Sequence, residues 1–244
     1  HPSLGKINRG TVSKILSKSS VRPHKISYYL DRRDPEFDSK MVQVLHVYKQ
    51  VSMIKDNSAD DLSSVYLSYD EKPGIQAISN IAPDLPPVPG KHPTVSRDYE
   101  YKRHGTVSFL AGIDLVTGHV HHMVTDRHRS LEFVTFLRLL DICYPDDVTI
   151  RIVLDNHSAH VSKETRLYLS SVPNRFDFIF TPKHGSWLNI IESFFAKMAK
   201  TFLRGIRVNS KDELKDRITN WVGEINAFPV VFNWKYGLDS LNEL

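Results

Sequence analysis

Apolar positions recur with helical spacing in the first part of the chain. Val12, Ile15 and Leu16 are three and four positions apart, which predicts a short helix over residues 8–18 with Asn8 as its cap. Residues 40–53 show the same period. A single short helix is not stable by itself, so we interpret residues 1–20 as the end of a helical module whose earlier helices lie upstream.

Beyond residue 62 the pattern predicts a sheet with interspersed helices. Apolar runs predict strands at 65–69, 106–114, 119–124, 148–154 and 176–180. Helical periods predict helices at 131–143, 165–169, 187–203 and 210–226. Ser210 and Glu213 have the spacing of a capping box, and the prolines of residues 80–104 predict an irregular connection. This order of elements predicts an α/β fold, a mixed sheet flanked by helices.

Composition mainly excludes protein classes. Hydrophobic residues make up 41% and charged residues 25% of the chain, as in ordinary globular proteins. No stretch reaches the roughly 18 to 20 apolar residues of a membrane helix, so we expect no membrane partner. Cys143 is the single cysteine, which excludes a disulfide within the chain. We therefore expect a reducing, cytoplasmic setting.

The net charge of +4 is unevenly distributed. Residues 1–55 hold eleven Lys and Arg against four acids, a net charge of +7, so the rest of the chain carries −3. A basic front on an acidic body is expected when one part holds a nucleic acid and the other uses carboxylates, although a solvated charge run explains it equally well. The candidate DNA contacts in this part are Arg9, Lys14, Lys18, Arg22, Arg32 and Arg33.

Three acidic residues lie where a sheet collects carboxylates. Asp70 and Asp155 each follow a predicted strand, and Glu192 lies near the start of a predicted helix. Each also has a structural explanation, since an Asp often caps a turn and a Glu in the first turn complements the helix dipole. The apolar neighbours of Glu192 predict that its carboxylate points into the protein. A divalent cation is the partner that would reconcile three buried carboxylates.

Three oxygen ligands suit Mg²⁺ or Mn²⁺ better than zinc. Two such ions about 4 Å apart can hold the attacking and leaving oxygens of a phosphodiester displacement. We therefore expect the three carboxylates within about 4 to 8 Å of one another, with the pKa of at least one of them raised. Asp114 also ends a predicted strand, but residues 115–118 give it the ordinary explanation of a hairpin turn.

Three blocks of sequence carry a resemblance to a known family. Residues 69–77, 153–160 and 185–192 resemble, in this order, the catalytic blocks of the mariner-like bacterial insertion-sequence transposases, which belong to the DDE superfamily of endonucleases. The 36 residues between Asp155 and Glu192 are slightly more than the most familiar mariner spacing. The resemblance implies an RNase H-like catalytic domain in which Asp70, Asp155 and Glu192 are catalytic and bind Mg²⁺, with Mn²⁺ as a substitute.

The resemblance covers nearly the whole chain and implies three parts. Residues 1–20 resemble the end of a truncated helix-turn-helix module, residues 21–61 a basic linker and helix, and residues 62–244 the RNase H-like DDE catalytic domain. We expect residues 1–55 to make few contacts with the catalytic core and to hold DNA or a partner subunit instead.

The implied activity is DNA transposition, in which the enzyme cleaves at transposon ends and transfers the strand into target DNA. The implied partners are double-stranded DNA with terminal inverted repeats and a second copy of the chain, and the implied location is the bacterial cytoplasm, at the nucleoid. Two alternatives stay open. One is an RNase H-like nuclease that only hydrolyses DNA, and the other is a DNA-binding protein with an inactive catalytic domain.

The loop at 181–186 is expected to border the active site, where Lys183 and His184 are candidate DNA contacts. His157 and His160 follow Asp155 and would either orient phosphate, buttress the site or do neither.

A further group of histidines occurs at His119, His121 and His122. A zinc site is the more specific of two hypotheses for these histidines, but no Cys or carboxylate at ligand spacing supports zinc. We expect exposed or DNA-facing side chains on a hairpin.

Overall fold

The computed structural model describes residues 7–18, 34–57 and 63–234, which form two units, His1–Arg32 and Arg33–Leu244. The predicted domain boundaries near residues 20 and 61 lie outside the described residues. So do Arg22, Arg32 and Arg33, three of the predicted DNA contacts.

The first unit contains α1 (Arg9–Lys18). Its predicted cap is confirmed, because the Thr11 backbone N–H donates to Asn8 Oδ1 at 2.8 Å. None of its residues is buried. Arg9, Lys14 and Lys18 are therefore exposed, as contacts to DNA phosphates require.

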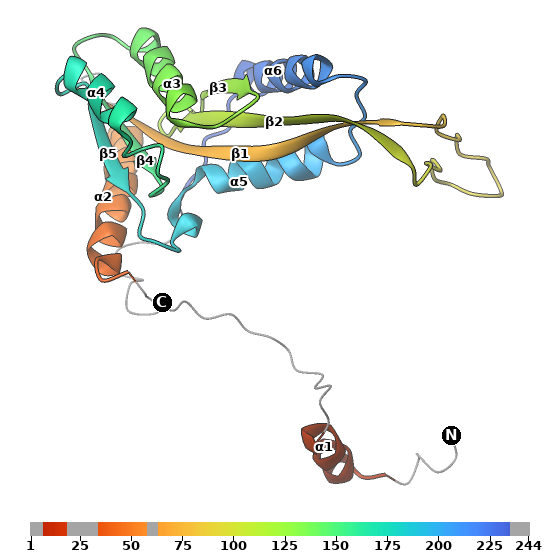
Figure 1. Cartoon of the computed structure of the whole chain (residues 1–244). Helices are drawn as coiled ribbons and strands as arrows, with labels where there is room; N and C mark the ends of the chain where they lie inside the picture. The colour runs from red at the N-terminus through yellow and green to blue at the C-terminus, as the bar shows by residue number, and fades with distance from the viewer. Residues whose placement is uncertain (1–6, 19–33, 58–62, 235–244) are drawn as a thin grey trace. The chain divides into compact units, whose positions relative to one another are not determined.

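The second unit is built on a five-stranded mixed sheet in the order β3-β2-β1-β4-β5 (Figure 1). The strands are β1 (Ser64–Asn80), β2 (Tyr101–Asp114), β3 (Val120–Thr125), β4 (Thr149–Leu154) and β5 (Phe176–Phe180). The first three are antiparallel, whereas β4 is parallel to both β1 and β5. The prediction of a mixed sheet flanked by helices is confirmed.

Helices cover both faces of this sheet. They are α3 (Ser130–Cys143), α4 (Lys163–Ser171), α5 (Ile191–Met198) and α6 (Lys211–Ala227). On one face, α3 packs against Leu67, Tyr69 and Leu110. On the other face, α5 and α6 pack against residues of β1, β2 and β3 that include Ile75 and Phe109. Figure 1 shows α3 and α5 on opposite sides of β1 and β2.

The start of α6 is as predicted, and the region before α5 is not. Ser210 Oγ accepts the Glu213 backbone N–H at 3.0 Å, and Glu213 Oε2 accepts the Asn209 backbone N–H at 2.7 Å. The helix expected at 187–203 is instead a 3₁₀ turn at Ser186–Leu188, then α5, then a π-helical turn at Ala199–Leu203. The break falls at Asn189, whose backbone is extended.

Strand β1 is much longer than predicted. Residues 70–74 look like a stop and a turn, but the strand continues through them with a bulge between Lys72 and Ile75, where one extra residue is accommodated and Gly74 adopts φ +70°. The bulge changes which face receives the odd-numbered side chains, because Leu67 and Tyr69 pack beneath α3 but Ile75 packs beneath α5. Asp70 therefore lies inside a strand and not at its end.

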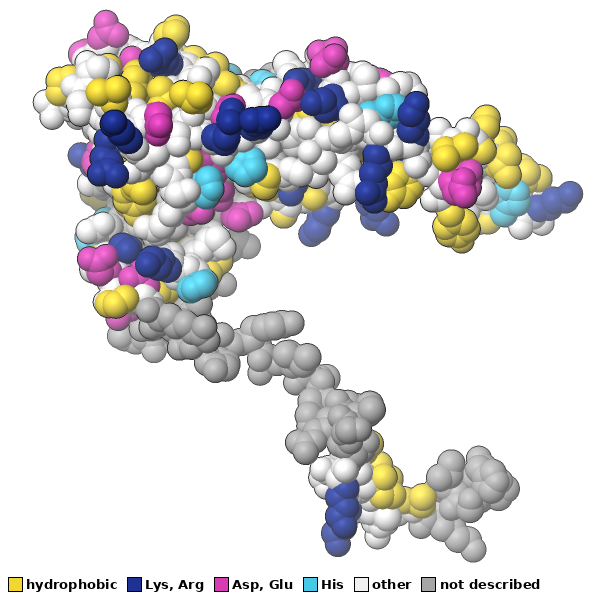
Figure 2. Space-filling view, in the orientation of Figure 1, with side chains coloured by type: hydrophobic (Ala, Val, Ile, Leu, Met, Phe, Trp, Pro, Cys, Tyr) yellow, Lys and Arg dark blue, Asp and Glu magenta, His cyan; other side chains and the backbone are white. Residues whose placement is uncertain are grey.

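Strands β1 and β2 continue beyond the rest of the sheet and end in a projecting connection (Figure 1). In Figure 2, hydrophobic side chains (yellow) gather at the tip of this projection. Its exposed apolar residues are Ile81, Leu85, Val88, Val95, Tyr99 and Tyr101.

Helix α2 (Phe37–Asn57) packs on the sheet unit. Met41, Val44 and Val51 are buried, and the Tyr48 hydroxyl donates to the Leu188 carbonyl oxygen at 2.6 Å. The expectation that residues 1–55 stay clear of the core is wrong for this helix, because its apolar stripe is covered. None of the described helices is long and apolar enough to span a membrane.

Candidate active site

Two of the predicted carboxylates are brought together by strand pairing. Strands β1 and β4 are parallel and in register up to Ser68 and Val153. Asp70 lies two positions after Ser68 in β1, and Asp155 lies two positions after Val153, directly beyond the end of β4, so the two are neighbours. One carboxylate oxygen from each of Asp70, Glu71 and Asp155 lies within 4.8 Å of the others. This closeness of Asp70 and Asp155 agrees with the sequence expectation.

Glu192 is in the first turn of α5 and is exposed. The prediction that its carboxylate points into the protein is wrong, because Ile191, Phe194 and Phe195 occupy the buried face of the helix. Its charge nevertheless reaches the site, since it contributes to the raised pKa of Asp70.

Burial raises the pKa of Asp70 from 3.8 to about 7, and the negative charges of Asp155, Glu71 and Glu192 add to this effect. A hydrogen bond from the Glu71 backbone N–H to Asp70 Oδ1, at 2.8 Å, opposes the rise only in part. The expectation of a raised carboxylate pKa is confirmed. Near neutral pH, Asp70 is therefore partly protonated in the protein alone.

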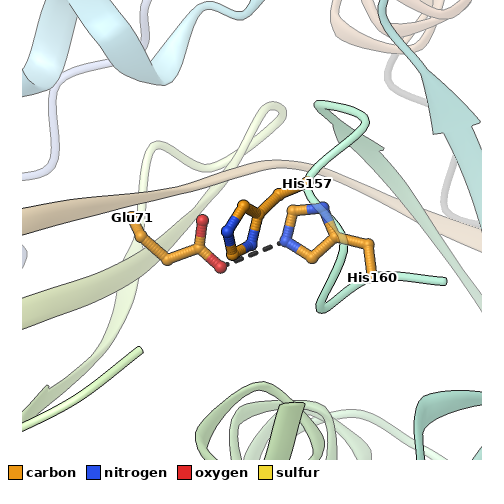
Figure 3. Close-up of side chains that lie close together, drawn as sticks. All are labelled: Glu71, His157 and His160. Atoms are coloured by element: carbon orange, nitrogen blue, oxygen red, sulfur yellow. Dashed lines mark hydrogen bonds and ion pairs between the residues drawn. The ribbon is translucent and has the colours of Figure 1, made fainter. Parts of the chain in front are cut away.

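Sequence reasoning missed Glu71. Its side chain is almost buried, and its Oε1 accepts a hydrogen bond from the Tyr69 hydroxyl at 2.8 Å. The same oxygen accepts a hydrogen bond from His160 Nε2 at 3.1 Å, drawn as a dashed line in Figure 3. The alternation of side chains along a strand could have indicated the position of Glu71. Asp70 and Glu71 are neighbours in a strand, so their side chains face opposite sides of the sheet. Asp70 faces α5, and Glu71 faces the α3 side with the partner residue Leu110.

His160 joins Glu71 to Asp155. Its Nδ1 is 2.9 Å from the Asp155 carbonyl oxygen and 3.2 Å from Asp155 Oδ1, and its side chain has no exposure. Burial alone would lower the pKa of His160, but the hydrogen bonds to Asp155 and Glu71 outweigh it and raise the pKa to about 10. Of the alternatives left open for this histidine, the buttress agrees with these contacts.

Asp155 is half-exposed, and hydrogen bonds stabilise its ionised carboxylate. The His157 backbone N–H donates to Asp155 Oδ1 at 2.9 Å. Burial pushes the pKa of Asp155 upward, but the hydrogen bonds from His160 and His157 outweigh it and hold the pKa below its ordinary value. The two neighbouring aspartates therefore differ in charge near pH 7, since Asp155 is ionised and Asp70 only partly so.

The loop at 181–186 is attached to this site. The Asn156 side chain donates to the Thr181 carbonyl oxygen, and the Lys183 backbone N–H donates to Asp34 Oδ2 at 2.9 Å. Both Lys183 and His184 are exposed. Gly185 is required by packing inside the loop, because a Cβ there would lie 2.7 Å from Pro182 Cγ.

The histidines at 119–122 do not form a metal site among the described residues, where both clusters of potential metal ligands include Glu71. His119 is exposed as expected, whereas His121 and His122 are half-buried, which corrects the expectation of exposed side chains for these two. His121 Nε2 is 2.8 Å from the Tyr144 hydroxyl, which donates to Asp114 at 3.1 Å. The hairpin explanation of Asp114 is confirmed, since its Oδ1 accepts the backbone N–H groups of residues 116 and 117 at 2.8 and 2.9 Å.

The two clusters of potential metal ligands fit a cation differently. Asp70, Glu71 and Asp155 offer carboxylate oxygens, the ligands that Mg²⁺ and Mn²⁺ prefer. Glu71, His157 and His160 also lie within 4.8 Å of one another, but a metal there would break the hydrogen bonds that hold His160. The aspartate side is the better cation site.

The chain is similar to a family of endonucleases and to a protein of an insertion element. Residues 74–215 match the family model described as "DDE superfamily endonuclease". The chain is 24% identical over 234 residues to the insertion element IS630 uncharacterized 39 kDa protein of Shigella sonnei, covering 95% of this chain and 62% of that protein.

Solved structures of the Mos1 mariner protein show the same fold. The Mos1 paired end complex with Mn has a TM-score of 0.54 at 15% identity, covering 91% of this chain and 65% of the Mos1 chain. The Mos1 strand transfer complex has a TM-score of 0.55 at 15% identity, covering 99% and 69%. The predicted RNase H-like fold class is confirmed by this likeness and by the sheet order. The chain spans somewhat less than two thirds of the IS630 protein and of the Mos1 chain in the paired end complex.

Proposed function

The chain belongs to the DDE superfamily of endonucleases, and from this premise we propose that it is the catalytic part of a DNA transposase. In this proposal it cleaves the phosphodiester backbone at transposon ends and joins the freed end to target DNA. The observation that carries the proposal is the pair of Asp70 in β1 and Asp155 directly after the adjacent β4, with the pKa of Asp70 raised by burial and by the neighbouring acids. Such a cluster is unfavourable by itself and suited to divalent cations.

Asp70 and Asp155 would hold Mg²⁺, with Mn²⁺ as a substitute and Glu192 as the third ligand. Glu71 would stay outside this set, because its Oε1 already accepts hydrogen bonds from Tyr69 and His160. When bound, these ions supply an activated oxygen nucleophile and stabilise the leaving oxygen of an in-line displacement. Asp155 is the ionised ligand, kept in place by His160 and by the His157 backbone. Asp70 releases its proton when a cation takes the place of that proton, so cation binding should be tighter above pH 7.

The proposed partner is double-stranded DNA, with the terminal inverted repeats of the element and a target duplex as substrates. Lys183 and His184 are exposed on the loop attached to Asp155 through Asn156, and they would contact phosphate there. Arg9, Lys14 and Lys18 would do so from α1. We also propose a homodimer, since joining two DNA ends takes two sites, and a location at the nucleoid in the bacterial cytoplasm.

The test uses the purified chain and a fluorescently labelled duplex that carries the terminal sequence flanking its own gene. The duplex is incubated with supercoiled plasmid in Mg²⁺, in Mn²⁺ or in EDTA, and gels measure nicking and transfer of the label to plasmid. Asp155→Asn removes a proposed ligand. Asp114→Asn is the matched control, because it makes the same chemical change at a buried aspartate that caps a hairpin.

The proposal predicts metal-dependent nicking and transfer that Asp155→Asn abolishes and Asp114→Asn retains. Nicking without transfer would favour the nuclease that only hydrolyses. DNA binding without nicking in either metal would favour the inactive catalytic domain. Cleavage that persists in Asp155→Asn would refute the assignment of the site.

A further inference from the structure

Asn189 is a buried polar residue between β1 and α5. It lies in the third sequence block, residues 185–192, but the proposed chemistry gives its side chain no role. It is 1% exposed and lies at the break between the 3₁₀ turn and α5. Its Oδ1 accepts a hydrogen bond from the Ser68 hydroxyl. Its Nδ2 donates to the Tyr69 carbonyl oxygen at 2.8 Å and contacts Asp70 Oδ2 at 3.5 Å.

Asn189 also bonds to the first turn of α5 through its backbone. The Asn189 carbonyl oxygen accepts the Glu192 backbone N–H at 3.1 Å, and Ser68 Oγ accepts the Ile191 backbone N–H at 3.0 Å. Asn189 and Ser68 therefore connect the strand that carries Asp70 to the helical turn that carries Glu192. Every hydrogen-bonding atom of the Asn189 amide has a partner in β1, which is the condition for a buried polar group to be stable.

These contacts fix the orientation of the Asp70 carboxylate. Its Oδ1 is held by the Glu71 backbone N–H, and its Oδ2 faces the Asn189 amide. A side chain without an N–H donor would leave the Tyr69 carbonyl oxygen unsatisfied and Asp70 Oδ2 without this neighbour. An apolar residue of the same size could fill the space but could not set the direction of the carboxylate.

We propose that Asn189, with Ser68 as its support, is a positioning residue that sets the separation and orientation of Asp70 and Glu192 for cation binding. The inference rests on the proposed function of these two carboxylates. It agrees with the place of the break in the expected single helix, since Asn189 is extended there and its side chain bonds to β1. Residues that orient metal ligands in this way typically change metal affinity by about 10–100-fold when removed.

The matched control is Asn226. It bridges α6 to β3 in the same manner, with Oδ1 accepting the Val120 backbone N–H at 2.8 Å and Nδ2 donating to the Val120 carbonyl oxygen at 2.9 Å. It contacts β3 and not β1. Asn226→Ala therefore reports the cost of losing a bridge between a helix and a strand without touching the carboxylates.

The experiment measures Mn²⁺ binding to the full chain without DNA, by electron paramagnetic resonance of free Mn²⁺, together with thermal unfolding. Mg²⁺ titrations of the cleavage assay follow. Asn189→Ala should weaken Mn²⁺ binding and raise the half-saturating Mg²⁺ concentration by about tenfold or more. Asn226→Ala should lower the melting temperature and leave both quantities within about twofold. Ser68→Ala is the milder variant in case Asn189→Ala does not fold, and it should shift Mn²⁺ affinity in the same direction by less.

Equal Mn²⁺ affinity in the parent and in the folded Asn189→Ala or Ser68→Ala protein would overturn the inference and leave the proposed function intact. Failure of the proposed function looks different. In that case the parent itself would bind no Mn²⁺, or would bind it equally well with Asp155→Asn.

Discussion

Replacing Asp70 by Asn should stabilise the protein in the absence of metal. The carboxyl group is mostly buried among Asp155, Glu71 and Glu192, and this environment raises its pKa from 3.8 to about 7. Asparagine has nearly the same shape but cannot ionise. The substitution therefore removes the cost of keeping a negative charge, or of taking up a proton, at this position.

The magnitude follows from the two pKa values. The difference between about 7 and 3.8 is about 3 pKa units, and about 1.36 kcal/mol for each unit gives an upper limit of about 4 kcal/mol. The new amide would face the amide of Asn189, so part of the gain is lost. We expect a net gain of about 1–3 kcal/mol in the free energy of unfolding at pH 8, or several degrees in melting temperature.

The sign of the pH dependence is fixed by linkage. A carboxyl whose pKa is raised on folding destabilises the folded protein only where the unfolded chain has released the proton. The cost is therefore absent below about pH 4, grows between pH 4 and 7, and is complete above pH 7. The advantage of Asp70→Asn should follow the same course.

The assay is urea unfolding in EDTA at pH 5 and pH 8, repeated at pH 8 with Mg²⁺. Mg²⁺ should stabilise the parent and have little effect on Asp70→Asn. Asp147→Asn, at an exposed aspartate, is the control for a general charge effect. A gain that is equal at both pH values, or a less stable Asp70→Asn protein at pH 8, would refute the reasoning.

Three further predictions concern activity. Asp155→Asn and Glu192→Gln should abolish cleavage while DNA binding in a gel-shift assay stays intact or strengthens, because each removes a proposed ligand and also a charge that repels phosphate. Weaker DNA binding would contradict this prediction. The control variant Asp114→Asn should cleave and bind DNA almost like the parent. His160→Ala should reduce cleavage about 10–100-fold by releasing Asp155, measured as initial rates with the parent as reference, and parental rates would argue against the buttress. Lys183→Ala should weaken binding of unrelated duplexes equally and lower the salt slope by about one; a loss confined to one sequence would exclude a simple phosphate contact.

The sequence predicts the sheet and most helices because their apolar periods are regular. It misplaces the end of β1, since Pro73 and Gly74 signal a turn locally but are absorbed by a bulge that pairing with β2 stabilises. The helix at 187–203 fails in the opposite way. Its apolar period is continuous, but the helix is interrupted at Asn189, whose side chain bonds to β1.

The site shows the same limits. Asp70 and Asp155 can be paired from strand order, because parallel neighbours bring equivalent positions together. The environment of Glu192 cannot be inferred from its apolar neighbours, since they line the other side of α5. Glu71 and His160 are 89 positions apart, and no local pattern indicates their hydrogen bond.

The bulge in β1 has a consequence for how this chain can change in length. Removing one residue between Lys72 and Ile75 would cancel the bulge and turn Ile75 and Ala77 from the core toward the opposite face. We therefore expect a one-residue insertion or deletion in the strand to be more disruptive than one in the connection between β1 and β2. The bulge thus ties the length of β1 between Asp70 and the projecting connection to the packing of Ile75 and Ala77.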